Sequence, residues 1–182
     1  MAINYYLLVV ADTIIGPGST TEEQLPPGCI ACTQTQTETW QTLEVVGGVI
    51  QAIPSAQLLT KAQAAQAAML KTACKSAITG GFASSALGAA NTYPSNLIDQ
   101  HNLAGSVIAS LLPNLPVGWT TNFWAMSSTG VWTFAPHTAA QIQQAGLDGK
   151  TWVTAQQTKL AGLLTQVQNA TTVSAVQAVV YS

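Results

Sequence analysis

The pattern of apolar positions changes near residue 54. Before it, Tyr5–Val10 form an unbroken apolar run, and the turn signal Gly16-Pro17-Gly18 follows a few residues later. Aromatic and β-branched residues that end at such a signal are typical of a strand, so we expect one strand from Ile3 to Ile15. Later, apolar residues flank Gly47-Gly48, and two glycines accept the positive φ angles of a tight hairpin turn. Residues 1–54 are therefore predicted to be a small β-rich region.

Residues 55–182 follow a helical pattern instead. An alanine-rich stretch begins at Ser55 and ends at Gly80-Gly81, which predicts one helix of about six turns. Its core-facing positions are expected to be Leu58, Ala62, Ala65, Met69, Ala73 and Ile78. Gln63 and the lysines of this helix are expected to face solvent.

A second helix is expected between Pro94-Ser95 and Pro113, with a stripe of residues at helical spacing turned to the core. The stripe consists of Leu97, His101, Ala104, Ile108 and Leu111. Further on, Thr138 and Gln141 match a capping box, which predicts a short helix up to Gly146 and a separate long helix from Gly149. Thr171 or Thr172 is expected to cap a last helix.

Two short hairpins complete this region, one over residues 82–93 and one over residues 119–135 with its turn at Ser127–Gly130. The expected fold class is thus α+β. A β-rich N-terminal region (1–54) precedes a mainly helical domain (55–182) that carries the two hairpins.

The second hairpin holds most of the aromatic side chains. They are Trp119, Phe123, Trp124, Trp132 and Phe134. A hairpin beside helices must bury one face, so the first interpretation is a core cluster. The alternative is an exposed aromatic surface on which sugars stack, as in a glycan-binding module for a host surface.

Charge is scarce and unevenly distributed. The 182 residues include five lysines, seven acids and no arginine, so charged residues make up 7% of the chain, against about 25% in ordinary soluble domains. Without a cluster of basic residues, binding to nucleic acid is not expected. Alanine, threonine and glutamine are abundant, and such a neutral surface favours contacts with further subunits. Five acids precede residue 60 and every lysine follows it, so the two regions differ in sign.

The chain offers little material for membrane insertion or export. The apolar run Tyr5–Ala11 is far shorter than the roughly 20 residues that cross a bilayer. The first residues also lack the basic flank of a signal peptide. We therefore expect no membrane insertion, and we expect the protein to stay in the compartment where it is made.

The two histidines do not suggest catalysis. His101 lies on the predicted core stripe, where we expect a hydrogen-bonded core histidine. His137 precedes the helix cap Thr138, and we expect it to tie this loop to the helix start through a backbone hydrogen bond. No Gly-x-Ser-x-Gly elbow accompanies either histidine, so a Ser-His-Asp triad has no support.

Cys29 and Cys32 have the spacing of a zinc half-site or a redox pair. A zinc site would need a second pair of ligands, and the sequence offers only Cys74 and the scattered histidines. A redox pair should open a helix, whereas Thr33–Thr37 is expected to lead into the hairpin around Gly47. We therefore interpret these residues as ordinary, partly buried cysteines, and expect no catalytic site, no metal and no cofactor.

Residues 61–182 resemble a domain of unknown function that recurs near the C-terminus of tailed-phage tail-fibre and tail-associated proteins. The resemblance rests on the order and spacing of Gly80-Gly81-Phe82, Ser84–Gly88, Thr92-Tyr93, Asp99–Leu103, Gly130–Trp132, Phe134–Gln141 and Ala170–Val173. Upstream, Leu25–Gln36 is similar to the short β segment that often precedes this domain.

The resemblance implies a structural, non-enzymatic component of a phage virion, located in the tail and made in the host cytoplasm. It implies a tail fibre or tail appendage that forms a homo-oligomer, with a trimer favoured by analogy. Its partners would be other tail proteins and, as a further candidate, a host cell-surface receptor. An alternative function is that of a tail-fibre assembly chaperone that does not remain in the virion.

Attachment to the tail is expected to involve the N-terminal region. The candidate attachment strand comprises Tyr5, Tyr6, Leu7, Leu8, Val9 and Val10. As an edge strand, it would extend a sheet of the partner. The alternative is that it is a central strand of its own small domain.

Overall fold

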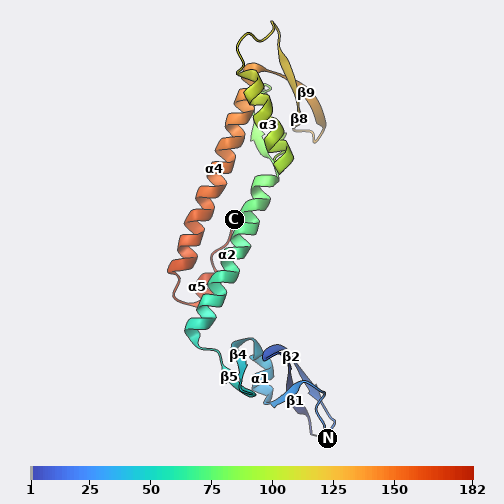
Figure 1. Ribbon diagram of the computed structural model, residues 1–182, viewed down its shortest axis with the longest axis vertical. Helices are drawn as coiled ribbons and strands as arrows, with labels where there is room; N and C mark the ends of the chain where they lie inside the picture. The colour runs from blue at the N-terminus through green and yellow to red at the C-terminus, as the bar shows by residue number, and fades with distance from the viewer. Residues whose placement is uncertain (1) are drawn as a thin grey trace. The chain divides into compact units, whose positions relative to one another are not determined.

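The computed structural model describes residues 2–182, and its contacts divide the chain into two compact units (Figure 1). The N-terminal unit extends to Ala62, and the C-terminal unit covers Gln63–Ser182. The boundary lies within helix α2 (Ser55–Thr79), whereas the sequence pattern placed it before Ser55. A β-rich region followed by a mainly helical one confirms the predicted α+β class.

The N-terminal unit contains two small antiparallel sheets. The first has the order β2-β1-β3, and the second pairs β4 with β5. These strands are β1 (Asn4–Val10), β2 (Thr13–Thr20), β3 (Cys29–Cys32), β4 (Leu43–Val46) and β5 (Val49–Ala52), with helix α1 (Gln34–Glu38) and a 3₁₀ turn (Trp40–Thr42) between β3 and β4. Leu7, Ile14 and Val45 form the buried core, against which Trp40 packs.

The single strand expected from Ile3 to Ile15 is wrong, because the chain turns at Ala11-Asp12. Both residues have positive φ angles, 46° and 61°, and this turn connects β1 to β2. Gly16-Pro17-Gly18 lies inside β2, which is an edge strand, the place where a sheet tolerates proline. The turn at Gly47-Gly48 is confirmed, with φ angles of 58° and 81° between β4 and β5.

The C-terminal unit joins its two predicted hairpins into one sheet with the order β6-β7-β8-β9. Its elements after α2 are β6 (Phe82–Ser84), β7 (Asn91–Tyr93), α3 (Leu97–Ser110), β8 (Thr120–Met126), β9 (Trp132–Thr138), α4 (Ala139–Asn169) and α5 (Val173–Gln177). Both hairpins are confirmed, and the link between them is the pair Thr92 and Met126. Thr172 caps α5, as predicted.

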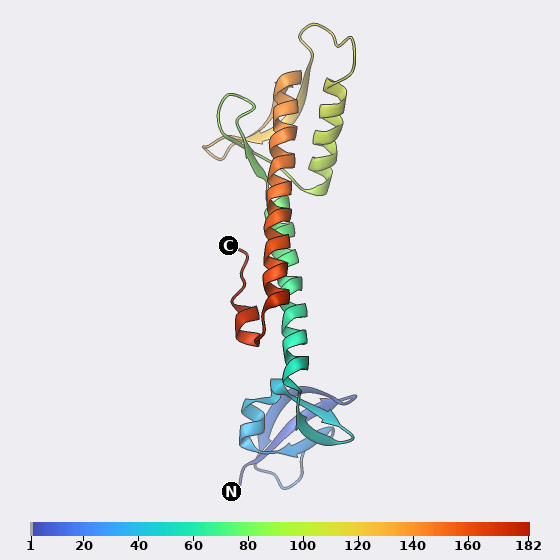
Figure 2. The same ribbon diagram turned by 90° about the vertical axis from the view of Figure 1, so that its left-hand side faces the viewer.

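Helices α2 and α4 lie side by side, as Figures 1 and 2 show. The Gln63 amide donates to the carbonyl of Val167 at 3.2 Å, and the Trp152 indole donates to the carbonyl of Ala77 at 3.3 Å. The pair is therefore antiparallel. Gln63 faces α4, so the expectation that it faces solvent is wrong. The expected core stripe of α2 is also wrong in part, since Met69 is exposed while Leu70 is buried.

Helix α4 runs without a break through Gly146 and Gly149, so the two helices expected there are one. The capping box of Thr138 and Gln141 at its start is confirmed. Both glycines mark points of close approach. A Cβ at residue 146 would lie 2.6 Å from Cγ2 of Val107 on α3, and one at residue 149 would lie 2.9 Å from the Phe82 ring. These glycines allow contact with neighbouring elements instead of ending the helix.

The core of the C-terminal unit lies where α3, α4 and the sheet meet. Its buried members are Phe82, Tyr93, Leu103, Phe123, Ala125, Ile142 and Ala145. Three aromatic rings stack in series at its centre, with Phe82 and Tyr93 centroids 5.4 Å apart and Tyr93 and Phe123 centroids 6.4 Å apart. Side chains from three strands and two helices thus share one aromatic centre.

The contact at Gly146 yields a test of this packing. Gly146→Ala forces a methyl group against Val107, whose β-branched side chain has little rotameric freedom in a helix. Overpacking costs about 1–3 kcal/mol, and the helix preference of alanine returns up to about 1 kcal/mol. We expect a net loss of about 1 kcal/mol in the free energy of unfolding, measured by denaturant titration.

Gly162→Ala on the same helix is the matched control, because, apart from the adjoining backbone of α4 itself, no atom lies within 4 Å of the position that the added methyl group would take. This variant should be more stable than the wild type by up to about 1 kcal/mol. Equal stabilisation by both substitutions would contradict the close approach of α3 and α4.

Candidate binding surface

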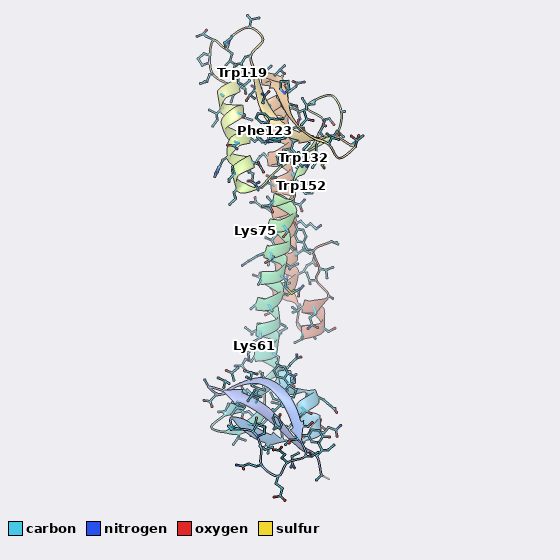
Figure 3. All side chains as sticks on the ribbon, turned by 90° about the vertical axis from the view of Figure 1, so that its right-hand side faces the viewer. Lys61, Lys75, Trp119, Phe123, Trp132 and Trp152 are labelled. Carbon is cyan, nitrogen blue, oxygen red and sulfur yellow. The ribbon has the colours of Figure 1, made fainter. Side chains whose placement is uncertain are left out.

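Strand alternation divides the aromatic residues of the β8–β9 hairpin between two faces. Phe123 points into the core, and Trp119, just before β8, packs against that core. Trp124, Trp132 and Phe134 occupy the opposite face, with 47%, 45% and 52% of their surfaces exposed. Trp119, Phe123 and Trp132 are labelled in Figure 3. The sequence thus suggested one cluster, whereas the structure has a core pair and an exposed trio.

Two of the exposed rings form a direct cross-strand pair. Trp124 lies opposite Phe134 in the register of β8 and β9, and their ring centroids are 5.2 Å apart with a tilt of 41°. Trp132 lies opposite Met126, further towards the turn of the hairpin. Such pairs stabilise a hairpin, but here they also leave apolar ring surface in contact with solvent.

A groove with a volume of about 520 Å³ separates this aromatic pair from α3. Trp124 and Phe134 line one side. Asp99, His101 and Asn102 of α3 line the other, and Asn122 of β8 adds a further amide. The groove therefore combines ring faces with hydrogen-bonding groups.

His101 is exposed, so its expected place in the core is wrong. The reason is the rotation of α3 about its axis, which places Leu103 and Val107 against the core. His101 is two residues before Leu103, about 200° around the helix, and so points away. The rest of the expected stripe follows it, since Leu97, Ile108 and Leu111 are also exposed.

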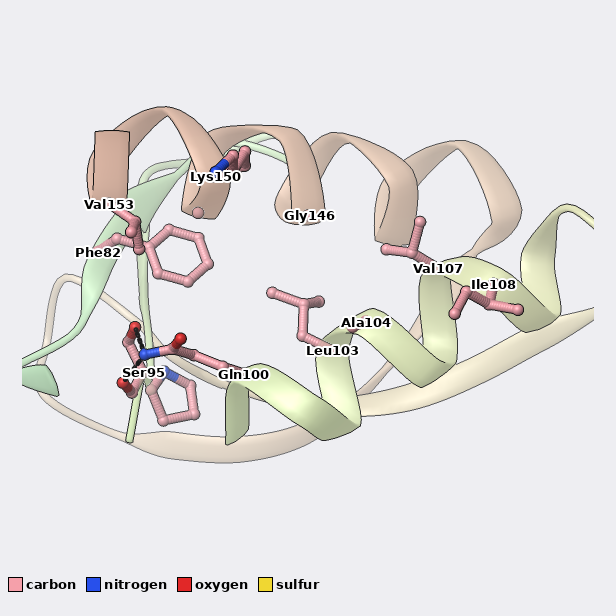
Figure 4. Close-up of a pocket in the computed structure, with 12 residues that line it drawn as sticks. Phe82, Ser95, Gln100, Leu103, Ala104, Val107, Ile108, Gly146, Lys150 and Val153 are labelled. Atoms are coloured by element: carbon pink, nitrogen blue, oxygen red, sulfur yellow. Dashed lines mark hydrogen bonds between the residues drawn. The ribbon is translucent and has the colours of Figure 1, made fainter. Parts of the chain in front are cut away.

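A second groove, of about 440 Å³, lies between α3 and α4 (Figure 4). Phe82, Leu103, Val107 and Gly146 are among its apolar lining residues, and Lys150 lies at one side. The Gln100 amide donates to the carbonyl of Ser95 at 2.8 Å and so is already engaged. This groove offers an apolar surface with little for a polar ligand to recognise.

His137 is buried and has a defined tautomer. Its Nδ1 lies 2.9 Å from the Ala135 carbonyl, which can only accept, so Nδ1 carries the proton. Nε2 then accepts from the Tyr93 hydroxyl at 2.8 Å. The backbone hydrogen bond was expected, but it lies within β9 rather than at the helix start. Burial, assisted by Asp148, raises the pKa of Tyr93 to about 12, so its hydroxyl remains a donor.

Other polar side chains of the C-terminal unit form hydrogen bonds with one another, but these do not have the arrangement of a catalytic triad. Ser84 donates to Asp148 at 2.5 Å, and the Gln144 amide donates to the other oxygen of the same carboxylate. Among residues 2–182, no histidine is hydrogen-bonded to a serine, and no three side chains of His, Cys, Asp or Glu form a group that could hold a metal ion.

Cys29 and Cys32 lie at the two ends of β3. Because side chains alternate along a strand, residues three apart point to opposite faces, which separates the two sulfurs. Burial raises the pKa of the Cys32 thiol, which opposes thiolate formation. The stretch after Cys32 was expected to lead directly into a hairpin, but Thr33 caps the short helix α1. The polar Thr and Gln residues of this stretch favour the helix cap.

The candidate attachment strand, Tyr5–Val10, falls within β1, the central strand of its sheet. Along Tyr5–Leu8, β1 pairs with β2 on one side and β3 on the other, so its backbone has no free edge. The structure thus has the central-strand arrangement. The edges of this sheet belong to β2 and β3.

His137 makes the stability of the protein depend on pH. Burial lowers its pKa below the ordinary 6.5, and the hydrogen bond to Ala135 opposes this shift. In the unfolded chain this imidazole gains a proton as the pH falls through about 6.5, while in the folded chain it stays neutral to lower pH. Its contribution is therefore complete above about pH 6.5 and is lost as the pH falls through the lowered pKa.

We expect the melting temperature to decrease between about pH 7.5 and pH 5.5, and His137→Gln to reduce this decrease. His101→Gln, the control at an exposed histidine, should leave the decrease unchanged. The same pH dependence in all three proteins would show that His137 is not responsible.

Comparison with known proteins gives one match. A family described as "Domain of unknown function (DUF4376)" matches residues 61–180. No curated protein and no solved structure matches the chain. In residues 2–182, no helix is both long and apolar enough to cross a membrane. The matched range runs from within α2 to beyond α5 and includes the whole aromatic hairpin, and so the chain belongs to the DUF4376 family.

Proposed function

We propose that this protein is a non-enzymatic structural component of a phage tail, a fibre or similar appendage, that assembles through its C-terminal unit. The resemblance of residues 61–182 to domains of tail-fibre and tail-associated proteins supports the phage role. The observation that carries the assembly role is an exposed apolar stripe along α3.

The stripe has the spacing of a coiled-coil seam. Its members are Leu97, His101, Ala104, Ile108 and the C-cap Leu111, at alternating intervals of four and three residues. This is the spacing with which helices pack knobs into holes. Leu97 and Leu111 are each 67% exposed and Ile108 is 64% exposed, so an apolar face with a recognisable packing pattern lies open in the single chain.

A second copy of this chain is the occupant that we propose for the stripe. Where the same helix stripe packs around a symmetry axis, copies of that stripe face one another, so a charge on the stripe would meet its own sign. The only charged residue of α3 is Asp99, which is not part of the stripe and lines the groove beside the aromatic hairpin. The stripe is thus free of the like-charge repulsion that opposes self-association. A trimer is favoured by analogy with fibre proteins.

The N-terminal unit is proposed to attach the protein to the tail. Since β1 is central, the backbone edges that a partner sheet could extend are those of β2 and β3. Pro17 in β2 removes one N–H donor from that edge. The edge of β3 is therefore the better candidate for strand addition.

Charge on the stripe should disrupt assembly without unfolding the chain. We expect Ile108→Lys to shift the protein from an oligomer to the monomeric mass of 18.9 kDa in light scattering, with an unchanged circular dichroism spectrum. Met69→Lys is the matched control, because Met69 on α2 is equally exposed, at 64%, but lies outside the stripe. Equal masses for the two variants would contradict an interface on α3.

An assembly chaperone that leaves the finished particle is the second candidate function. Mass spectrometry of purified virions separates the two. A structural component should be present in several copies per particle, and a chaperone should be missing. Absence from virions that contain the other tail proteins would overturn the structural role.

A further inference from the structure

We infer that the groove between α3 and the β8–β9 hairpin, which Trp124 and Phe134 line, binds an uncharged saccharide. This inference concerns a different surface from the proposed interface of α3 and does not depend on self-association. His101 borders both surfaces, so the argument and the experiment below rest on other residues.

The aromatic side of the groove fits the apolar face of a sugar ring. Trp124 and Phe134 expose about half of their surfaces although they belong to a regular hairpin whose other face is already buried. Their rings meet at a tilt of 41°, which gives the groove two differently inclined ring faces instead of one flat platform. The C–H groups on one face of a pyranose can pack against such rings while its hydroxyl groups stay at the rim.

The opposite side supplies hydrogen-bonding groups that suit hydroxyls. One oxygen of Asp99 accepts from the Asn96 backbone N–H at 3.2 Å as part of the helix cap, which fixes the carboxylate at the groove. Its other oxygen accepts no hydrogen bond from residues 2–182. The amides of Asn102 and Asn122 likewise have no side-chain partner within the described part of the chain. A held carboxylate and two amides together offer acceptors and donors, the combination that a polyol needs.

The composition of the groove argues against other ligand classes. No lysine or arginine lines it, and His101 is its only basic side chain, so a phosphate, sulfate or nucleotide would find no permanent counter-charge. Asp99 is its only carboxylate, and no metal-binding group forms among residues 2–182. Asp99 would also repel an acidic sugar. The volume of about 520 Å³ is within the range of about 300–1,000 Å³ typical of small-ligand sites, which suits a short, uncharged oligosaccharide.

Trp124 and Trp132 form a matched pair for testing this site. Both tryptophans lie on the same face of the same hairpin with nearly equal exposure, 47% and 45%, but only Trp124 lines the groove. Replacing either by alanine removes the same side chain from the same face, and Trp124→Ala also removes the ring contact with Phe134. Any difference in ligand binding therefore reports the groove and not the loss of a surface tryptophan.

The experiment screens the full-length chain on an array of uncharged and acidic oligosaccharides, and measures the best ligand by calorimetry. We expect the wild type to bind at least one uncharged oligosaccharide. Trp124→Ala should weaken that binding by about tenfold or more, and Trp132→Ala by less than about twofold. Asn122→Ala, an exposed position in β8, should also weaken it and provides the test if Trp124→Ala does not fold.

Three results would overturn the inference. They are the absence of binding to every uncharged oligosaccharide on the array, equal losses for Trp124→Ala and Trp132→Ala, and full retention of binding by a folded Asn122→Ala. None of them bears on the mass of the protein, so the saccharide site and the assembly role fail or survive separately.

Discussion

The close approach of α3 to α4 determines what the C-terminal unit presents to its surroundings. Gly146 allows Val107 to contact the α4 backbone, and this contact turns Leu103 and Val107 inward. Because side chains on a helix point in fixed directions relative to one another, the rotation that turns Leu103 and Val107 inward turns Leu97 and Ile108 outward. The exposed stripe and the groove beside the aromatic hairpin both result from this packing of α3 against α4.

Glutamine side chains form hydrogen bonds between elements of the C-terminal unit, in places where other proteins often have ion pairs. The Gln63 amide donates to carbonyls at the end of α4, and the Gln66 amide donates to the Val179 carbonyl at 2.6 Å. The Gln156 side chain accepts from the Tyr181 hydroxyl at 2.7 Å. These neutral bonds join α2, α4 and the segment after α5 and do not depend on ion pairs. A charge content of 7% is thus compatible with a well-connected helical unit, and it leaves few charges on the outer surfaces that would repel a second copy.

Local sequence signals were sufficient to predict most helices, strands and turns. Which face of a helix is buried depends on tertiary contacts, and the sequence pattern did not predict it for α3. The Gly47-Gly48 turn, the capping box at Thr138 and both hairpins depend on neighbouring residues, and the sequence was sufficient for them. Helix α3 carries two apolar stripes, and the more apolar one lies outside, so periodicity alone selected the wrong face. The division of the aromatic residues between the two faces of the β8–β9 hairpin follows from strand alternation and was predictable from the sequence. The approach of Asp99 to Trp124 was not, because it depends on how α3 packs over the sheet.

The central claim is that the outward stripe of α3 is an interface between copies of this chain. Sedimentation equilibrium of the wild-type protein over a range of concentrations tests it most directly. The account predicts a mass that is a multiple of 18.9 kDa and that falls towards this value on dilution, or a stable multiple if the interface is tight. A mass of 18.9 kDa at every concentration would contradict it.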